Sequence, residues 1–169
     1  HEGGYSTFRF NLTPFARVGD NELRVEVDNS YTRKVYPQKA DFTFYGGIYR
    51  DVYLIEVPKE HFALDKSGSL GIQVSTTVDE TGNDAFVTVK VDVNKPDQIV
   101  DIFVRTLEGD VLGEESVKLE GTSGTVSIPV SGVTLWDRIN SPKLYEVRAV
   151  LQNSQDIVDI RFGFRTFSF

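Results

Sequence analysis

The sequence contains no cysteine and no methionine, and only one of its 169 residues is a tryptophan. The absence of cysteine excludes disulfide bonds, thiolate nucleophiles and zinc–thiolate sites. It leaves the compartment open, because cytoplasmic, periplasmic and secreted proteins can all lack cysteine. No apolar run approaches the ~20 residues of a membrane span, and no signal peptide is recognisable.

The sequence also has no excess of basic residues. It contains 18 Lys and Arg and 25 Asp and Glu, which give a formal net charge of −7. This balance argues against nucleic acid or an anionic membrane as a partner. We expect no cofactor and no bound metal. The sequence starts at His1 and has no methionine, so we interpret it as a piece of a longer protein.

What dominates the sequence is alternation of apolar and polar residues, with almost no helical periodicity, and this predicts an all-β fold. After His61, seven alternating runs are separated by turn signals. Seven short strands in about 110 residues are typical of an immunoglobulin-like β-sandwich, here without its disulfide. The seven predicted strands are Leu70–Val78, Ala85–Val93, Ile99–Leu107, Val111–Leu119, Thr125–Val130, Leu144–Leu151 and Ile157–Phe169.

The first 58 residues are expected to hold about three strands: Tyr5–Phe10, Glu22–Asp28 and a run from Asp41 to Pro58. Three strands are too few to close a sandwich, so we expect a preceding portion to complete this domain. The sequence thus predicts an incomplete domain over residues 1–58 and a complete sandwich over residues 59–169.

Three stretches of the first segment carry a family resemblance. His1–Phe8 (HEGGYSTF), Gly19–Val27 (GDNELRVEV) and Asp41–Leu54 (DFTFYGGIYRDVYL) resemble the end of the sugar-binding jelly-roll (galactose-binding-like) domain of family 2 glycoside hydrolases. The β-galactosidases and β-glucuronidases are the best-known members of that family.

Three later stretches resemble the end of the same family's immunoglobulin-like domain. They are Val133–Trp136 (VTLW), Ser141–Tyr145 (SPKLY) and Gly163–Thr166 (GFRT). All six stretches follow the family's order along the chain. The resemblance implies a parent enzyme that is a retaining glycosidase, β-galactosidase-like, with a terminal β-glycoside as substrate.

The resemblance also implies that this piece is not catalytic. In the family both catalytic glutamates lie on a (β/α)₈ barrel of ~250 residues, for which this chain has no room. Asn21-Glu22 matches the residue types of the family's acid/base pair, but it lies in a predicted turn, so we assign no catalytic residue. The missing barrel is the expected partner.

One substrate-binding residue, Asp41, follows from the resemblance. In the family, the loop before the Gly-Gly-Ile-Xaa-Arg stretch reaches the barrel rim, where its aspartate contacts hydroxyls of the terminal sugar. Asp41 holds the matching position, six residues before Gly47. A carboxylate can accept charge-assisted hydrogen bonds from two sugar hydroxyls; the alternative is that Asp41 caps its own backbone.

Two other conspicuous side chains are interpreted structurally. Arg50 is expected to form an internal ion pair or to brace the domain junction. Trp136 is expected to close one end of the sandwich and not to stack on a sugar.

A second reading is a free-standing carbohydrate-binding or adhesive β-sandwich module. The incomplete first segment argues against it, and so do the aromatic residues, which mostly occupy alternating core positions. An interaction domain of another kind is a third reading. The sequence leaves open which sugar the enzyme hydrolyses. It also leaves open whether identical chains assemble into an oligomer.

Overall fold

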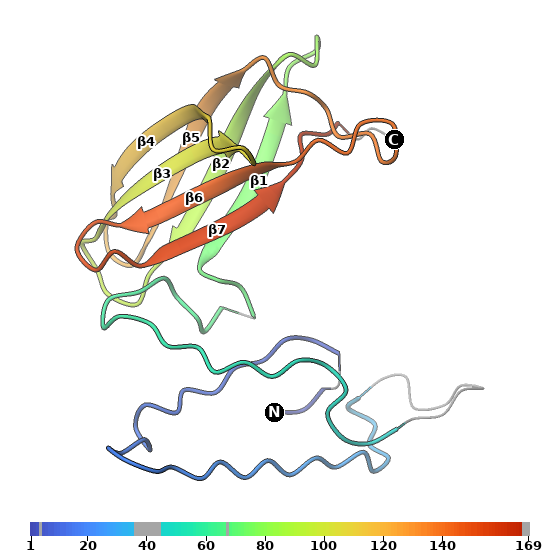
Figure 1. Cartoon of the computed structure of the whole chain (residues 1–169), viewed down its shortest axis with the longest axis vertical. Helices are drawn as coiled ribbons and strands as arrows, with labels where there is room; N and C mark the ends of the chain where they lie inside the picture. Colours follow the sequence, from blue (N-terminus) through green and yellow to red (C-terminus); the bar gives the residue numbers. More distant parts are fainter. Residues whose placement is uncertain (4, 36–44, 67, 167–169) are drawn as a thin grey trace. The chain divides into compact units, whose positions relative to one another are not determined.

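The computed structural model describes residues 1–3, 5–35, 45–66 and 68–166. The chain divides into two compact units, His1–Glu56 and Val57–Phe169, and each is described by itself (Figure 1). Within the described ranges we find no helix with the length and hydrophobicity needed to span a membrane.

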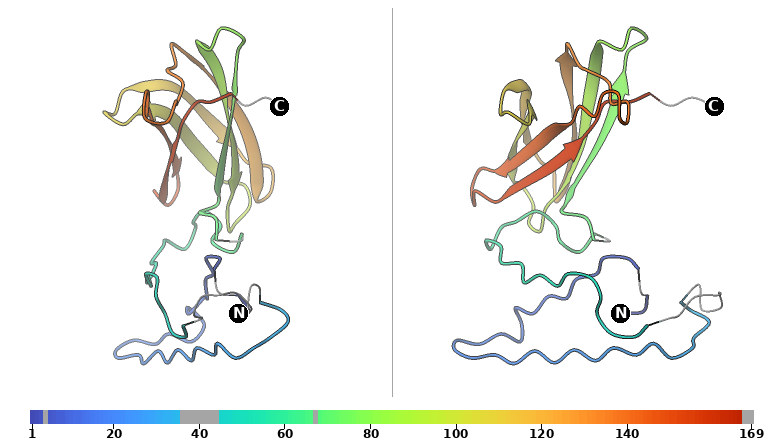
Figure 2. Two further views of the ribbon diagram at one scale, coloured as in Figure 1. Left: turned by 90° about the vertical axis from the view of Figure 1, so that its right-hand side faces the viewer. Right: turned by 45° about the vertical axis from the view of Figure 1, so that its right-hand side comes forward.

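The second unit is a sandwich of two antiparallel sheets, with strand orders β1-β2-β5 and β4-β3-β6-β7. Figure 2 shows the two layers facing each other. This confirms the predicted all-β sandwich. The strands are β1 (Ile72–Val78), β2 (Asp84–Asp92), β3 (Ile99–Thr106), β4 (Val111–Lys118), β5 (Ser123–Ser131), β6 (Tyr145–Leu151) and β7 (Ile157–Phe162).

The core lies between the two sheets because every second residue of a strand points to the same face. On β2, Val87, Val89 and Val91 are fully buried, and on β6 the residues from Tyr145 to Leu151 alternate between buried and half-buried. Burying one such aliphatic side chain contributes roughly 1.5–3 kcal/mol. The apolar residues of the alternating pattern are therefore the residues that form the core.

The predicted strand bounds hold closely except at the last strand. The prediction extended it from Ile157 to Phe169, but β7 ends at Phe162, opposite Tyr145, the first residue of its partner β6. Beyond that point β6 offers no residue to pair with. Phe164 instead forms an isolated parallel bridge with Leu135 and is fully buried.

The first unit corrects the sequence prediction. Its described residues form no strand and no helix, although strands were predicted at Tyr5–Phe10, at Glu22–Asp28 and after Tyr45. A turn follows Leu12, since the amides of Phe15 and Ala16 both donate to the Leu12 carbonyl. A strand needs a neighbouring strand to satisfy its backbone groups, and alternation cannot supply that neighbour.

Candidate functional site

Asp41, the predicted substrate-binding residue, lies outside the described residues, and its role stays a prediction. The glycines that follow it are described. Gly47 has φ = 93°, in the left-handed region that favours glycine. A Cβ added to Gly46 would lie 3.1 Å from the Asn29 Cγ atom. One glycine thus supplies a backbone conformation, and the other permits a close approach between two segments of the first unit.

Arg50 connects two distant segments of the first unit. Its Nη1 atom donates a hydrogen bond of 2.8 Å to the backbone carbonyl of Tyr5. Its guanidinium carbon lies 5.2 Å from the centre of the Tyr49 ring, within range of a cation–π interaction. Among the described residues its partners are thus a carbonyl and an aromatic ring within the first unit, and neither the predicted ion pair nor the predicted brace of the domain junction is among them.

Asn21 also has a structural role, as expected for a residue in a turn. Its side chain accepts a hydrogen bond from the Arg17 amide (3.0 Å) and donates to the carbonyls of Arg17 and Gly19, both at 2.8 Å. These three bonds close the turn around Gly19, whose φ is 95°. The Asn21-Glu22 pair is therefore part of a turn.

Local hydrogen bonds lower the pKa of several carboxyl groups. The Ser30 hydroxyl holds the pKa of Asp28 below its ordinary value, and the Thr81 hydroxyl does the same for Asp79. Both carboxylates, ionised at neutral pH like any ordinary aspartate, thereby keep their charge to lower pH. This is the opposite of the raised pKa that a carboxyl needs to act as a general acid.

A network of four charged residues crosses the four-stranded sheet. Arg148 on β6 binds both oxygens of Asp159 on β7, each at 2.8 Å. These hydrogen bonds, together with the charges of Arg148 and Arg105, lower the pKa of Asp159. Arg105 on β3 also pairs with Glu146. Both bonds are cross-strand pairs of directly opposite residues, so their evident role is to stabilise the sheet.

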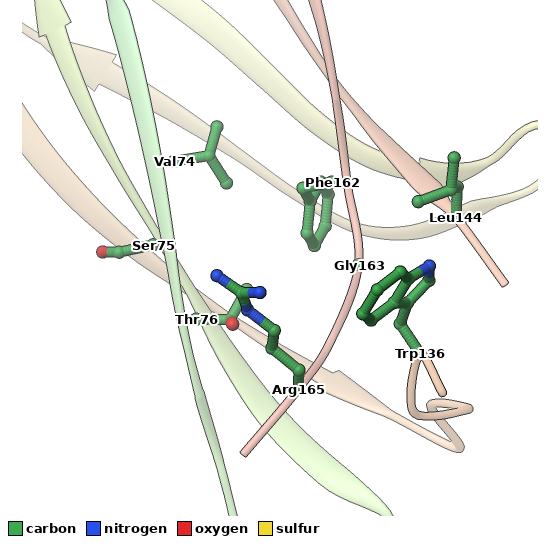
Figure 3. A pocket seen from close by; sticks show the side chains of 8 residues that line it. All are labelled: Val74, Ser75, Thr76, Trp136, Leu144, Phe162, Gly163 and Arg165. Atoms are coloured by element: carbon green, nitrogen blue, oxygen red, sulfur yellow. The ribbon is translucent and has the colours of Figure 1, made fainter. Parts of the chain in front are cut away.

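The second unit has an open groove of ≈ 460 Å³ between β1 and the segment that follows β7 (Figure 3). Its apolar lining comes from Val74 on β1, Phe162 on β7, and Trp136 and Leu144 on the connection between β5 and β6. All four side chains are half-buried. Part of each apolar side chain is therefore still accessible, and accessible apolar surface of this kind can form a binding site for a partner.

The polar lining of the groove is made of Ser75, Thr76 and Arg165. Figure 3 shows the Arg165 side chain extending toward the two β1 residues. No described residue gives the Arg165 guanidinium an ion pair or a hydrogen bond. The groove therefore presents, beside an apolar surface, a positive charge that no described residue pairs with.

Trp136 lies in the groove because its backbone is fixed against the chain after β7. Its amide donates to the Phe164 carbonyl at 2.7 Å. A Cβ added to Gly163 would lie 2.9 Å from the Trp136 Cβ, so only glycine fits there. The predicted packing role agrees with these contacts, but no sequence pattern indicated a groove. In the described part of the chain, no group of three or more His, Asp or Glu could hold a metal ion.

Comparison with known proteins identifies the family of this chain. The profile of the glycosyl hydrolases family 2 matches residues 70–165, which include all seven strands and the groove. A candidate beta-glucuronidase of Formosa agariphila is 31% identical over 176 residues, covering 100% of this chain and 20% of the relative. A beta-galactosidase of Rhizobium meliloti is 28% identical over 170 residues, covering 96% of this chain and 21% of the relative.

A solved structure, the FMN-binding beta-glucuronidase from Facaelibacterium prausnitzii L2-6, matches with a TM-score of 0.71 and 35% identity over 80% of this chain and 21% of that one. The matched residues 70–165 lie within the second unit, so the family match covers its β-sandwich. The chain belongs to glycoside hydrolase family 2. It spans about a fifth of the length of these relatives.

Proposed function

We propose that this chain is a non-catalytic part of a family 2 glycoside hydrolase that hydrolyses terminal β-galactosides. It supplies a rigid β-sandwich and, through Asp41, one carboxylate that contacts the terminal sugar. The observation that supports this most is the family match over residues 70–165 in a chain that spans only about a fifth of its relatives. β-Glucuronide hydrolysis is the second candidate, favoured by the 31% and 35% identical relatives.

The non-catalytic role is supported by what the described residues form. A retaining glycosidase needs two carboxyl groups about 5–5.5 Å apart on either side of the glycosidic bond. In this family they are expected on a (β/α)₈ barrel, whereas the described residues form only strands, turns and irregular segments. The carboxylates with altered pKa values are engaged in turns and in cross-strand pairs.

The glycone contact through Asp41 is supported by the segment that follows it. Gly46 and Gly47 allow close approach and a left-handed backbone conformation, and Arg50 ties the segment to the Tyr5 carbonyl. A loop held in this way at its C-terminal side can present a carboxylate at a defined position. Positioning of this kind is what a sugar-binding residue requires.

The test compares this chain with the full-length enzyme on two chromogenic substrates, p-nitrophenyl β-galactoside and p-nitrophenyl β-glucuronide. The full-length enzyme is expected to hydrolyse the β-galactoside faster, and residues 1–169 alone to hydrolyse neither. Faster cleavage of the β-glucuronide would replace the first candidate with the second. Turnover by residues 1–169 that disappears on mutation of one of their carboxylates would overturn the non-catalytic role.

A further inference from the structure

The groove lies at the open side of the sandwich, between two sheet edges. β1 is an edge strand that pairs only with β2, and β7 is an edge strand that pairs only with β6, among the strands that the structure describes. The two edge strands contact each other across the sandwich, and Figure 1 shows them side by side. Edge strands present unpaired backbone N–H and C=O groups, which another extended segment can bind.

The lining of the groove defines what such a segment would carry. Trp136, Leu144 and Phe162 offer half-buried apolar surface, which favours an occupant with apolar side chains. Arg165 offers a guanidinium without a described partner. None of the lining residues carries a carboxylate, although the chain as a whole has a net charge of −7.

Charge complementarity therefore favours an acidic occupant. An arginine can bind a carboxylate with two parallel hydrogen bonds, and the groove itself supplies no competing acid. A second copy of this chain would bring another net charge of −7 toward the first, which like-charge repulsion disfavours. A segment of the same polypeptide brings only its own few charges and benefits from a high effective concentration, which a second copy lacks.

We propose that the groove docks an extended segment, bearing an aspartate or glutamate for Arg165, from the part of the full-length enzyme outside residues 1–169. The segment adds its backbone to the β1 or β7 edge, inserts apolar side chains beside Trp136 and Phe162, and pairs its carboxylate with Arg165. This is recognition by β-strand addition. The proposal rests on the proposed function only in placing the segment within the parent enzyme.

The test is photo-crosslinking in the full-length enzyme. The photoreactive residue p-benzoylphenylalanine replaces Ser75, which is exposed and lines the groove. The matched control carries it at Lys118, exposed on β4 at the opposite edge of the β7 sheet. Mass spectrometry is expected to find, from position 75 only, a crosslink to a peptide of the same polypeptide outside residues 1–169 that contains an acidic residue.

Three results would overturn the proposal: crosslinks from position 75 only within residues 1–169, only between two copies, or at no higher yield than from position 118. Because crosslinking needs no hydrolysis, an enzyme inactive on both substrates would refute the proposed function without affecting this result. The converse also holds, since an active enzyme with no such crosslink refutes only the docking.

Charge variants test the role of Arg165 directly. In the enzyme with p-benzoylphenylalanine at position 75, Arg165→Glu is expected to lower the crosslink yield severalfold, because it repels the acidic segment. Arg165→Lys keeps the charge and is expected to retain most of the yield. The control is Arg161→Glu, an exposed arginine on β7 outside the groove. Equal yields for Arg165→Glu and Arg161→Glu would overturn the charge pairing.

Discussion

The same sequence pattern has two different outcomes in the two units of this molecule. Glu22–Asp28 (ELRVEVD) and β2 (DAFVTVKVD) both alternate apolar and polar residues. Leu23, Val25 and Val27 are 65%, 58% and 48% exposed, whereas the three valines of β2 from Val87 to Val91 are fully buried. Alternation therefore specifies which side chains share a face, and burial depends on a second sheet to cover that face.

The difference extends to how each unit is held together. In the sandwich, antiparallel ladders join the seven strands into two sheets, with one register shift between Val104 and Arg105 on β3. In the first unit the described contacts are turns and a few bridges between segments, such as the Arg50–Tyr5 hydrogen bond and the exposed Lys34–Glu2 ion pair. Exposed ion pairs contribute only about 0–1 kcal/mol, so the first unit must derive its stability from further contacts.

The largest expected effect comes from separating the two units. Residues 57–169 are expected to unfold in one cooperative transition, with the roughly 5–15 kcal/mol typical of a domain, and residues 1–56 to show no cooperative transition. Circular dichroism melts of the two pieces measure this. Trypsin is expected to cut the intact chain first at Arg33 or Lys34, which lie in the first unit. A cooperative melt of residues 1–56 alone would contradict the comparison.

A core aromatic of the sandwich gives the next largest effect. Phe164 is fully buried, with ring centres 4.9 Å from Tyr145 and 5.1 Å from Phe162. Phe164→Ala is expected to lower the free energy of unfolding by about 3–5 kcal/mol, measured by urea denaturation. The matched control is Phe10→Ala in the first unit, 65% exposed, which is expected to cost within about 0.5 kcal/mol. Similar losses for both variants would show that the first unit has a core.

The sequence predicted the sandwich well because its strands carry the information locally. Period-2 alternation and turn residues located all seven strands. The one large error in the bounds, at the last strand, arose because the end of β7 depends on where its partner β6 begins, at Tyr145. In the first unit the same alternation predicted strands that the described residues do not form, because pairing depends on residues elsewhere.

The candidate functional sites were harder to predict from the sequence than the fold. Asp41 was found only through the family resemblance, since an aspartate in a loop has no signature of its own. The groove was missed because its lining is assembled from separate segments: Val74 on β1, Trp136 before β6 and Arg165 after β7. The resemblance did single out Trp136 and Arg165, within VTLW and GFRT, but gave no hint that they share a surface.

The proposed contact between Asp41 of the first unit and the sugar is tested by Asp41→Asn in the full-length enzyme. If the carboxylate holds sugar hydroxyls, its loss removes a charged hydrogen bond of roughly 1.5–3 kcal/mol, and kcat/KM should fall by about ten- to a few-hundredfold. The melting temperature should stay nearly unchanged. Asp51→Asn is the matched control, because Asp51 lies in the same unit and already accepts a hydrogen bond from Tyr53; it should keep wild-type kinetics. Wild-type kinetics for Asp41→Asn would identify Asp41 as a structural cap.

The smallest expected effect concerns the charged network on the sheet of the second unit. Asp159 has a lowered pKa because Arg148 donates two hydrogen bonds to it. A carboxyl with a lowered folded-state pKa contributes stability above its unfolded-state pKa of about 3.9, and this stability is lost as the pH falls through the folded-state value. Since the side chain is 34% exposed, the contribution at neutral pH is at most about 1 kcal/mol.

Asp159→Asn is therefore expected to destabilise residues 57–169 slightly at pH 7 and by progressively less below about pH 4. Urea midpoints of the wild type and the variant at pH 7, 4 and 2.5 measure this convergence. Glu115→Gln serves as the control, because Glu115 is exposed on β4 and has no ion pair with a described residue; its midpoints should follow the wild type at every pH. A deficit of Asp159→Asn that stays constant from pH 7 to pH 2.5 would mean that Asp159 contributes through packing and neutral hydrogen bonds, and the ion pair would then add nothing to the stability of the sheet.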